Sequence, residues 1–494
     1  MVSTAMDWIE HYDKSLASAD EAVQIVKSGD TVVLDPSVSS FLINALAARK
    51  DDLQNIRVLT HGPFEDQDWL REGYQETFNV IAQFYLGGIA RPAYDKKLID
   101  YYPMILSHEF KPYVDNRGPE YKADVFITRI SPPDQHGYCS FGAGIWDSRR
   151  WAQTAKTVIA QHDPTYIRTY GNNFIHISEV DLSVEYNPPE ITFEEAETMI
   201  EDVVDEEVRS AILRYLPHMS GIRRQEWIPH MCGMGLSEIR GLGREQGWDD
   251  PPEDAQPFAE YVSELVPDGS TIQIGIGSPG RYLPRLGAFD GKKDLGWHSE
   301  MAAPGVLKLV ENGTLNGSRK TIHRGKAIGT SVHGCSQEEI EWAHNNPLVE
   351  LYDAEYVVNI RTVAAHENYV SMNNAITVDL SGQINSETVG TRLWNGTGGQ
   401  TELHIGAVFS KGGRAITLLW ATAAGGTISR IVPQLCKGGV VTIPRTFADT
   451  IVTEYGVAQL LGKSIRERAK ELISVAHPDF RKDLQRAADK LYYP

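Results

Sequence analysis

The sequence has few cysteines and no long hydrophobic run, and both absences exclude classes of protein. Its four cysteines, Cys139, Cys232, Cys335 and Cys436, lie far apart and form no C-x-x-C pair. This spacing excludes zinc-ribbon and thioredoxin motifs, and so few thiols in so long a chain indicate a reducing compartment. No stretch of about 18 apolar residues is present, which excludes a transmembrane helix, and residues 1–14 lack the apolar run of a secretory signal. We therefore expect a cytoplasmic protein that binds no membrane.

Basic residues are also in the minority. The chain has 47 Lys and Arg against 66 Asp and Glu, a formal net charge of −19. Nucleic-acid affinity comes mostly from Lys and Arg contacts with phosphates, so this balance argues against a nucleic-acid partner. It does not exclude a small polyanionic ligand, because a pocket needs only a few local cations. Nine of the acids lie between Glu190 and Glu207, which we interpret as a solvated helix begun by the capping box of Thr192 and Glu195.

The composition is that of a globular α/β protein. Hydrophobic residues make up 41% and charged residues 23% of the 494 residues, and such a length is typical of about two to four domains. Two segments each read as turn, buried strand, helix and second strand, the βαβ pattern of a parallel sheet. The first comprises residues 29–36, 40–49 and 56–59, and the second comprises residues 268–277, 281–288 and 295–298. We interpret them as a duplication, although any α/β protein contains several such units.

Weaker patterns complete the expected organisation. Further strands are predicted at residues 125–128, 415–420, 440–443 and 450–453. A helix is predicted to begin at the capping box of Ser464 and Glu467 and to stop before Pro478. We place an N-terminal α/β domain at residues 1–215, a linker or lid at 216–255, and a C-terminal α/β domain at 256–494.

The second βαβ segment carries the candidate chemistry. Its first strand ends in Gly275-Ile276-Gly277 and its second strand ends in His298-Ser299-Glu300. The carboxyl ends of parallel strands meet at one edge of a sheet, where ligands bind, so the glycine turn and the carboxylate are expected to lie close together. A third glycine-rich loop spans residues 395–400 and offers further backbone N–H donors. A carboxylate beside such donors is typical of acyl transfer, whereas the glycine turn alone is weak evidence for a dinucleotide-binding oxidoreductase.

Motifs along most of the chain resemble those of one family. They are Ser131–Ser140, Phe174–Ser178, Thr271–Gly277, His298–Met301, Ser371–Asn373, Asp379–Gln383, Gly396–Gln400, Ser429–Pro433, Val452–Gly456 and Ala476–Arg481. In this order they resemble the acetyl-CoA hydrolase/transferase family, the class I CoA-transferases, which includes butyryl-CoA:acetate, succinyl-CoA:acetate and 4-hydroxybutyrate CoA-transferases. The resemblance implies two similar open α/β domains with mainly parallel sheets and an active site at their junction.

The resemblance also implies a mechanism. Glu300 would attack an acyl-CoA thioester and pass through a mixed anhydride to a glutamyl-CoA thioester, which a carboxylic acid acceptor then resolves. The N–H groups of Ile276, flanked by Gly275 and Gly277, and of Gly399 or Gly398 would hold the oxyanion. The carboxylate is expected to be ionised at neutral pH without an activating base. CoA would be a substrate rather than a bound cofactor, no metal is implied, and a homodimer or higher homo-oligomer is expected.

Two residues match substrate-positioning residues of the family. Asn359 matches an asparagine near the reacting carboxylate, but Ile360 and Arg361 follow it where the family often has proline, and a turn-capping role is the alternative. Glu454 matches a second active-site carboxylate, with a structural ion pair as the alternative. His298 is expected to pack or to hydrogen-bond, since the mechanism needs no base.

Three questions stay open at this level. An acyl-CoA hydrolase on the same scaffold is the alternative function, and a non-catalytic CoA-binding subunit is disfavoured by Glu300 and the two glycine loops. The stretch 188–252 is atypical for the family. Its apolar side chains would line an acyl pocket or form an interface: Trp227, Met231, Met234 and Trp248.

Overall fold

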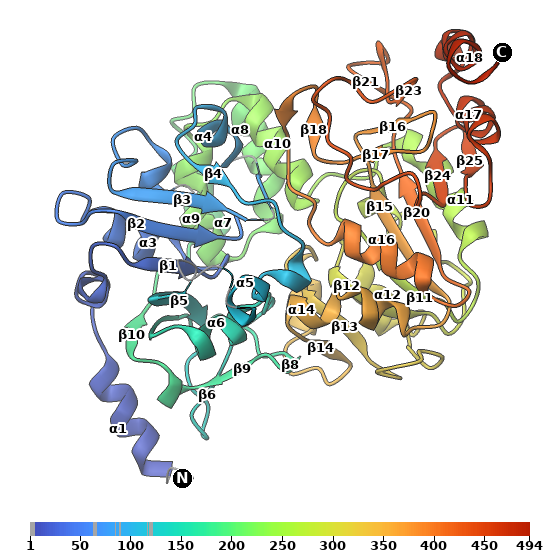
Figure 1. Ribbon diagram of the computed structural model, residues 1–494. Helices are drawn as coiled ribbons and strands as arrows, with labels where there is room; N and C mark the ends of the chain where they lie inside the picture. The colour runs from blue at the N-terminus through green and yellow to red at the C-terminus, as the bar shows by residue number, and fades with distance from the viewer. Residues whose placement is uncertain (1–4, 63–66, 84, 88–89, 116, 118–121) are drawn as a thin grey trace. The chain divides into compact units, whose positions relative to one another are not determined.

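Parallel sheets organise both halves of the chain, as the two βαβ segments predict (Figure 1). The computed structural model describes residues 5–62, 67–83, 85–87, 90–115, 117 and 122–494. By contacts the chain forms two units. Unit 1 comprises Met1–Met104, His108–Asp249 and Ser336–Asn346, and unit 2 comprises Ile105–Ser107, Asp250–Cys335 and Pro347–Pro494.

Unit 1 contains a parallel sheet with the strand order β10-β7-β5-β1-β2-β3-β4. Its strands are β1 (Thr31–Leu34), β2 (Ile56–Thr60), β3 (Phe78–Ala82), β4 (Asp100–Tyr101), β5 (Val125–Ile130), β7 (Thr157–His162) and β10 (Leu182–Glu185). The helices before residue 190 are α1 (Ala5–Ser15), α2 (Ala19–Ala22), α3 (Ser40–Ala47), α4 (Ala90–Asp95), α5 (Lys111–Val114) and α6 (Ser148–Thr154). The central strands are buried along their whole length, as expected for a sheet covered by helices on both faces.

A group of helices follows the sheet of unit 1. It comprises α7 (Phe193–Met199), α8 (Glu206–Tyr215), α9 (Gly221–Met231) and α10 (Leu236–Gln246). The predicted capping box of Thr192 and Glu195 begins α7. Met231 and Trp248 are buried in a hydrophobic cluster of these helices, and Trp227 and Met234 pack against it. These four side chains therefore contribute to a local core.

Unit 2 contains a second parallel sheet, with one antiparallel strand at its edge, in the order β25-β24-β20-β15-β11-β12-β13-β14. Its strands are β11 (Thr271–Ile274), β12 (Gly296–Met301), β13 (Ala327–Ser331), β14 (Val349–Leu351), β15 (Tyr369–Asn374), β20 (Arg414–Leu418), β24 (Thr450–Thr453) and β25 (Gly456–Gln459). Its helices are α11 (Gln256–Leu265), α12 (Val306–Glu311), α14 (Ala354–Val357), α15 (Ile360–Ala364), α16 (Gln400–Phe409), α17 (Ile465–Ser474) and α18 (Pro478–Tyr492). Helix α17 has the predicted capping box, and Pro478 begins α18.

The two sheets repeat one topology. Numbered by chain order within each unit, the seven parallel strands lie in the order 7-6-5-1-2-3-4 in both sheets. In each sheet the first strand lies between the second and the fifth, β1 between β2 and β5, and β11 between β12 and β15. This confirms two similar α/β domains. The order reverses beside β11, which makes the carboxyl end of this strand a topological switch point, where ligands bind in such sheets.

Three predicted elements differ from the structure. The acidic stretch 190–207, expected to be one helix, is divided between α7 and the start of α8, and residues 200–205 lie outside both. The helix expected at 281–288 is a short 3-10 turn, Gly280–Tyr282, because Pro284 and Gly287, with φ of +76°, interrupt it. The strand expected at 440–443 is reduced to a single bridge from Ile443 to Ile384, because Pro444 follows directly and cannot donate to a sheet.

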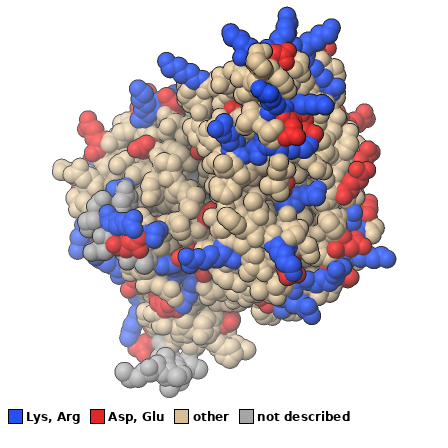
Figure 2. Space-filling view, turned by 45° about the vertical axis from the view of Figure 1, so that its right-hand side comes forward, with Lys and Arg blue, Asp and Glu red and all other residues tan. Residues whose placement is uncertain are grey.

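The surface carries both signs of charge. Figure 2 shows Lys and Arg side chains among Asp and Glu side chains over one face, so the net charge of −19 leaves room for local basic regions. Helix α18 shows this mixture, with exposed cations at Lys482, Arg486 and Lys490 and exposed acids at Asp479, Asp483 and Asp489. None of the helices in the described part of the chain is long and apolar enough to cross a membrane.

Candidate active site

Glu300 reaches the N-terminus of a helix. It lies near the carboxyl end of β12, and its Oε2 accepts a hydrogen bond of 2.7 Å from the N–H of Gly399, the N-cap residue of α16. The N–H groups in the first turn of a helix have no partner within the helix and favour an anion. The predicted carboxylate and one predicted donor are therefore brought together, although 99 residues separate them in the chain.

The glycines of this loop make the close approach possible. A Cβ atom on Gly399 would lie 2.3 Å from Glu300 Oε2, well inside van der Waals contact. Gly398 has a φ of +51°, in the left-handed region that favours glycine. A Cβ atom there would lie 3.6 Å from Glu300 Oε1, an ordinary contact. The two glycines thus serve different needs, space at Gly399 and backbone conformation at Gly398.

The carboxyl group of Glu300 differs from the sequence-based expectation in its ionisation. Burial raises its pKa from 4.5 to about 7, and the hydrogen bond from Gly399 opposes this shift. A group with this pKa is about half ionised at pH 7. This direction differs from the expectation of full ionisation at neutral pH, because that expectation took no account of the burial of this side chain.

The second predicted donor lies on the neighbouring strand. Strands β11 and β12 pair with Ile272 opposite Trp297, and counting onward places Gly275 level with Glu300. Among the described residues, the N–H of Ile276 has no hydrogen-bond partner. The Ile276 N–H is thus available at the switch point, one strand away from Glu300.

Asn374 holds the glycine turn and was missed by the sequence analysis. Its Oδ1 accepts a hydrogen bond of 2.8 Å from the N–H of Gly280, and a Cβ atom on Gly277 would lie 2.9 Å from its Nδ2. Gly275, Gly277 and Gly280 have the spacing of a dinucleotide fingerprint. A 3-10 turn of three residues follows them, where that fingerprint requires a helix.

A buried polar network lies behind this turn. Gln273 accepts hydrogen bonds from Ser371 at 2.8 Å and from Asn373 at 3.0 Å, and it donates to Asn373 at 2.9 Å. All three residues are buried. Because each buried polar group is satisfied by the others, the network fixes β11 against β15 and so fixes the glycine turn.

The two predicted positioning residues have local contacts. The side chain of Asn359 accepts a hydrogen bond of 3.0 Å from the N–H of Arg361 and so caps α15. Asn359 directly follows Val358 in the chain. The Cγ1 atom of Val358 would lie 3.2 Å from a Cβ atom added to Gly399, so Asn359 is near the loop that binds Glu300. Both the capping role and a place beside the site are compatible with this position. Its role in positioning substrate stays a prediction.

Glu454 lies elsewhere along the sheet. Its Oε2 accepts a hydrogen bond of 2.8 Å from the N–H of Ala421. Burial lowers the pKa of Arg430, and the charge of Glu454 opposes this shift. Strand β24, which precedes Glu454, is four strands from β12, or about 19 Å at the usual strand spacing. The proposed active-site role of Glu454 therefore stays a prediction.

His298 is enclosed by protein. It is fully buried, its Nε2 lies 2.8 Å from the carbonyl oxygen of Val357, and its ring packs edge-on against His366 at 4.6 Å. Burial lowers the pKa of His298 well below its usual range. A packing and hydrogen-bonding role, as expected from the sequence, accounts for these contacts.

Glu402 is a buried acid in the first turn of α16. Both of its carboxylate oxygens accept from the N–H of Ser107, at 3.1 and 3.3 Å. Burial raises the pKa of Glu402 to about 7, hydrogen bonds from Ser107 and Leu106 oppose the shift, and the charge of Glu300 adds to it. The sequence offers one signal for Glu402, an acid two positions after Gln400 in the glycine-rich loop. Its hydrogen-bond partner Ser107 lies 295 residues away in the chain, so the contact shows only in the structure.

A second polar cluster lies in unit 1. His61, Glu109 and Asp147 are buried, and their potential ligand atoms lie within 4.8 Å of one another. Glu109 Oε1 also accepts hydrogen bonds from Trp151 at 3.0 Å and from Gln83 at 3.1 Å. The N–H groups of Trp151 and Gln83 are hydrogen-bond donors and cannot bind a metal ion. These contacts therefore indicate a buried carboxylate that is held by hydrogen bonds.

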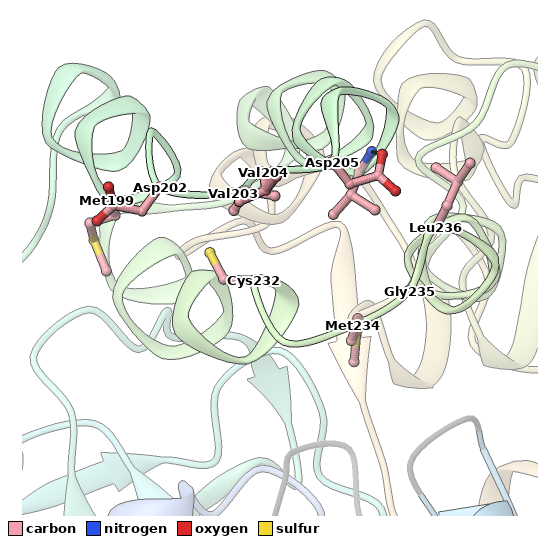
Figure 3. A pocket seen from close by; sticks show the side chains of 10 residues that line it. Met199, Asp202, Val203, Val204, Asp205, Cys232, Met234, Gly235 and Leu236 are labelled. Carbon is pink, nitrogen blue, oxygen red and sulfur yellow. Dashed lines mark hydrogen bonds between the residues drawn. The ribbon is translucent and has the colours of Figure 1, made fainter.

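A pocket of about 470 Å³ lies among the helices α7–α10 (Figure 3). Its lining combines apolar and acidic side chains, among them Met199, Val204, Asp205 and Met234. Met234, one of the four side chains expected to line an acyl pocket or an interface, lines it, whereas Glu300, Asn359, Glu454 and the predicted glycine donors do not. The atypical stretch 188–252 therefore forms a separate feature of unit 1, and a role for it in acyl selectivity stays a prediction.

Comparisons with known proteins identify the family of this chain. Two family models match, the acetyl-CoA hydrolase/transferase N-terminal domain over residues 1–193 and its C-terminal domain over residues 336–488. The 4-hydroxybutyrate coenzyme A transferase of Clostridium kluyveri is 34% identical, covering 99% of this chain and 100% of the relative. The succinyl-CoA:cyclohexane-1-carboxylate CoA transferase of Geobacter metallireducens is 33% identical, covering 98% and 97%.

Structural similarity also extends over the whole chain. RipA from Yersinia pestis matches with a TM-score of 0.79 at 27% identity, covering 100% of both chains.

The acetyl-CoA hydrolase of Kluyveromyces lactis is a more distant relative in sequence, 29% identical over 42% of this chain and 38% of its own. Full-length similarity to enzymes that transfer CoA makes this chain a member of the CoA-transferase class. More narrowly, it belongs to the acetyl-CoA hydrolase/transferase family, which confirms the resemblance seen in its motifs.

Proposed function

We propose that this enzyme moves CoA from an acyl-CoA donor to a carboxylic acid through a glutamyl-CoA thioester on Glu300. The observation that carries the proposal is the placement of the Glu300 carboxylate 2.7 Å from the Gly399 N–H at the start of α16. A carboxylate nucleophile beside backbone donors can exchange one thioester for another without ATP, because the acyl bond energy is conserved in each step.

The steps balance without a proton donor. A carboxylate oxygen of Glu300 attacks the thioester carbonyl, and the carbon–sulfur bond breaks to give a mixed anhydride and the CoA thiolate. The thiolate attacks the Glu300 carbonyl of this anhydride, which releases the donor carboxylate and leaves the glutamyl-CoA thioester. An acceptor carboxylate repeats both steps in reverse and leaves as the new acyl-CoA.

Gly399 has two roles in this sequence. In the free enzyme its N–H holds Glu300, which orients the nucleophile. When an oxygen of Glu300 turns toward the thioester, the same N–H and that of Ile276 become donors for the oxyanion. Each such donor typically contributes about 2.7–4 kcal/mol to the lowering of the barrier.

Trapping tests the intermediate. The enzyme is incubated with butyryl-CoA alone and treated with borohydride, which reduces a glutamyl thioester to a primary alcohol. We expect peptide mass spectrometry to place this alcohol at Glu300, with activity lost only in samples that received butyryl-CoA. An unmodified Glu300 peptide in an active preparation would refute the covalent mechanism.

Hydrolysis is the second candidate, favoured by the acetyl-CoA hydrolases among the distant relatives. In that reaction water, in place of a carboxylate, attacks the covalent intermediate. Incubation of butyryl-CoA with and without acetate separates the two functions. We expect acetyl-CoA to form and free CoA to stay low when acetate is present, whereas a hydrolase releases free CoA at the same rate in both samples.

The raised pKa of Glu300 predicts the pH dependence of acylation. The attacking form is the carboxylate, whose fraction falls as pH drops through about 7. The rate of donor carboxylate release in a single turnover is therefore expected to be about tenfold lower at pH 6 than its plateau above pH 8. A rate that is constant from pH 5 to 8 would show that Glu300 keeps an ordinary pKa. The homodimer and the cytoplasmic location expected from the sequence remain predictions.

A further inference from the structure

We propose that Glu402 is a positioning residue that sets the charge and the orientation of Glu300 by holding residues 105–107 against the first turn of α16. This inference rests on the proposed function, because it concerns the reactivity of the same nucleophile. Glu402 is fully buried, and it touches neither substrate nor the reacting atoms in the mechanism above.

The first support is the anchoring of a short segment. The chain passes from unit 1 into unit 2 at Ile105 and returns to unit 1 at His108. Within unit 2, Glu402 accepts the N–H of Ser107 with both oxygens, at 3.1 and 3.3 Å. The segment is thus attached to α16 by a charge-assisted hydrogen bond, which is stronger than a bond between neutral groups.

The second support is that two acids share one helix N-terminus. Gly399, which binds Glu300, is the N-cap of α16, and Glu402 is the third residue of the same helix. Burial and the charge of Glu300 raise the pKa of Glu402 to about 7, close to that of Glu300. Two interacting acids of this kind titrate as a pair, so each charge opposes the ionisation of the other.

The neighbouring basic side chains do not cancel the repulsion between the charges of Glu300 and Glu402. Helix α16 packs against α15, β15 and β20. Arg361 on α15 is exposed, so water screens its charge. Arg414 is the first residue of β20 and lies at the opposite edge of the sheet. On α16 itself, His404 is fully buried, and burial lowers its pKa, so it stays neutral.

A consequence follows for the covalent intermediate. Formation of the glutamyl-CoA thioester removes the negative charge of Glu300, because the donor carboxylate carries it away. Glu402 then ionises more readily and releases its proton to the solvent. The pair therefore retains about one negative charge in both states, which keeps the helix N-terminus compensated.

Substitution of Glu402 separates its charge from its hydrogen bond. Glu402→Gln keeps an oxygen to accept the Ser107 N–H but removes the charge, so the pKa of Glu300 should fall. We expect the acid limb of the acylation profile with butyryl-CoA to move down by up to about one pH unit. Relative to the rate at pH 8, acylation at pH 6 would then be up to about fivefold faster than in the unmodified enzyme.

Two further variants serve as controls. Glu402→Asp keeps the charge but shortens the reach to Ser107, so it should lower kcat without moving the limb. Asp449→Asn removes a buried carboxylate that accepts a backbone N–H, from Ala415 at 2.8 Å, at the opposite edge of the sheet. It should leave the limb in place. An unmoved limb in a folded Glu402→Gln enzyme would overturn the proposal.

Proton release provides an independent measurement. At pH 7 in weak buffer, a pH indicator should report the release of up to about one proton per site as the thioester forms from butyryl-CoA in the unmodified enzyme. Glu300 alone, with its pKa of about 7, accounts for about half a proton, so Glu402→Gln should release clearly less. Equal proton release by the two enzymes would overturn the coupling while leaving the proposed function intact. Absence of any borohydride adduct at Glu300 would instead refute the proposed function.

Discussion

Replacement of Glu300 by alanine is expected to reduce CoA transfer by about 10⁴-fold or more, because it removes the group that forms the covalent intermediate. Glu300→Asp keeps the carboxylate but draws it back by one methylene from Gly399 and from the thioester. A displacement of about 1 Å costs on the order of 10²-fold, so this variant should have intermediate activity. Formation of acetyl-CoA from butyryl-CoA and acetate, followed by chromatography, measures both effects.

The stability of these variants distinguishes a catalytic role from a structural one. Burial opposes the ionisation of Glu300, so this carboxylate destabilises the folded state. Replacing Glu300 by alanine removes this unfavourable contribution to the free energy of folding. The thermal midpoint of Glu300→Ala is therefore expected to be no lower than that of the unmodified enzyme. Glu311→Ala, at the exposed end of α12, is the matched control and should retain full activity. Full turnover by Glu300→Ala would contradict the assignment of the nucleophile.

The fold was predictable from sequence where its signals are local. Buried strands such as 31–34 and 271–274 are short apolar runs beside Gly and Asp, and their positions followed from these residues alone. The strand predicted at 440–443 is wrong because its apolar run is followed directly by Pro444, and only a single bridge forms there. The identical strand order of the two sheets joins strands far apart in the chain, so only the structure shows it.

The site was predictable in its parts but not in its energetics. Glu300 and Gly399 came from strand ends, a glycine loop and the family resemblance, and their contact follows from the fold. The raised pKa of Glu300 depends on burial by many distant residues, and no short motif encodes it. Glu402 was missed for the same reason, because its partner Ser107 lies far away in the sequence.

Substitution of Gly399 by alanine is expected to have the second largest effect, a loss of about 10²- to 10³-fold in kcat. The backbone of Gly399, with φ of −81°, suits alanine. The side chains of Leu403 and Val358, at 3.1 and 3.2 Å from the new Cβ, need to move by only a few tenths of an ångström, so the protein should still fold. The new Cβ atom would lie 2.3 Å from Glu300 Oε2, and the carboxylate must leave the N–H group that orients it. The effect should therefore appear in single-turnover acylation rather than in the binding of CoA.

Gly398→Ala provides the contrast. Its Cβ would make only an ordinary contact with Glu300, at 3.6 Å, but its φ of +51° is unfavourable for alanine by about 1–2 kcal/mol. This variant should lose thermal stability and keep most of its acylation rate, the reverse of Gly399→Ala. Equal rates of acylation in the two variants would show that the contact of Glu300 with Gly399 does not orient the nucleophile, and that the carboxylate reacts from another position.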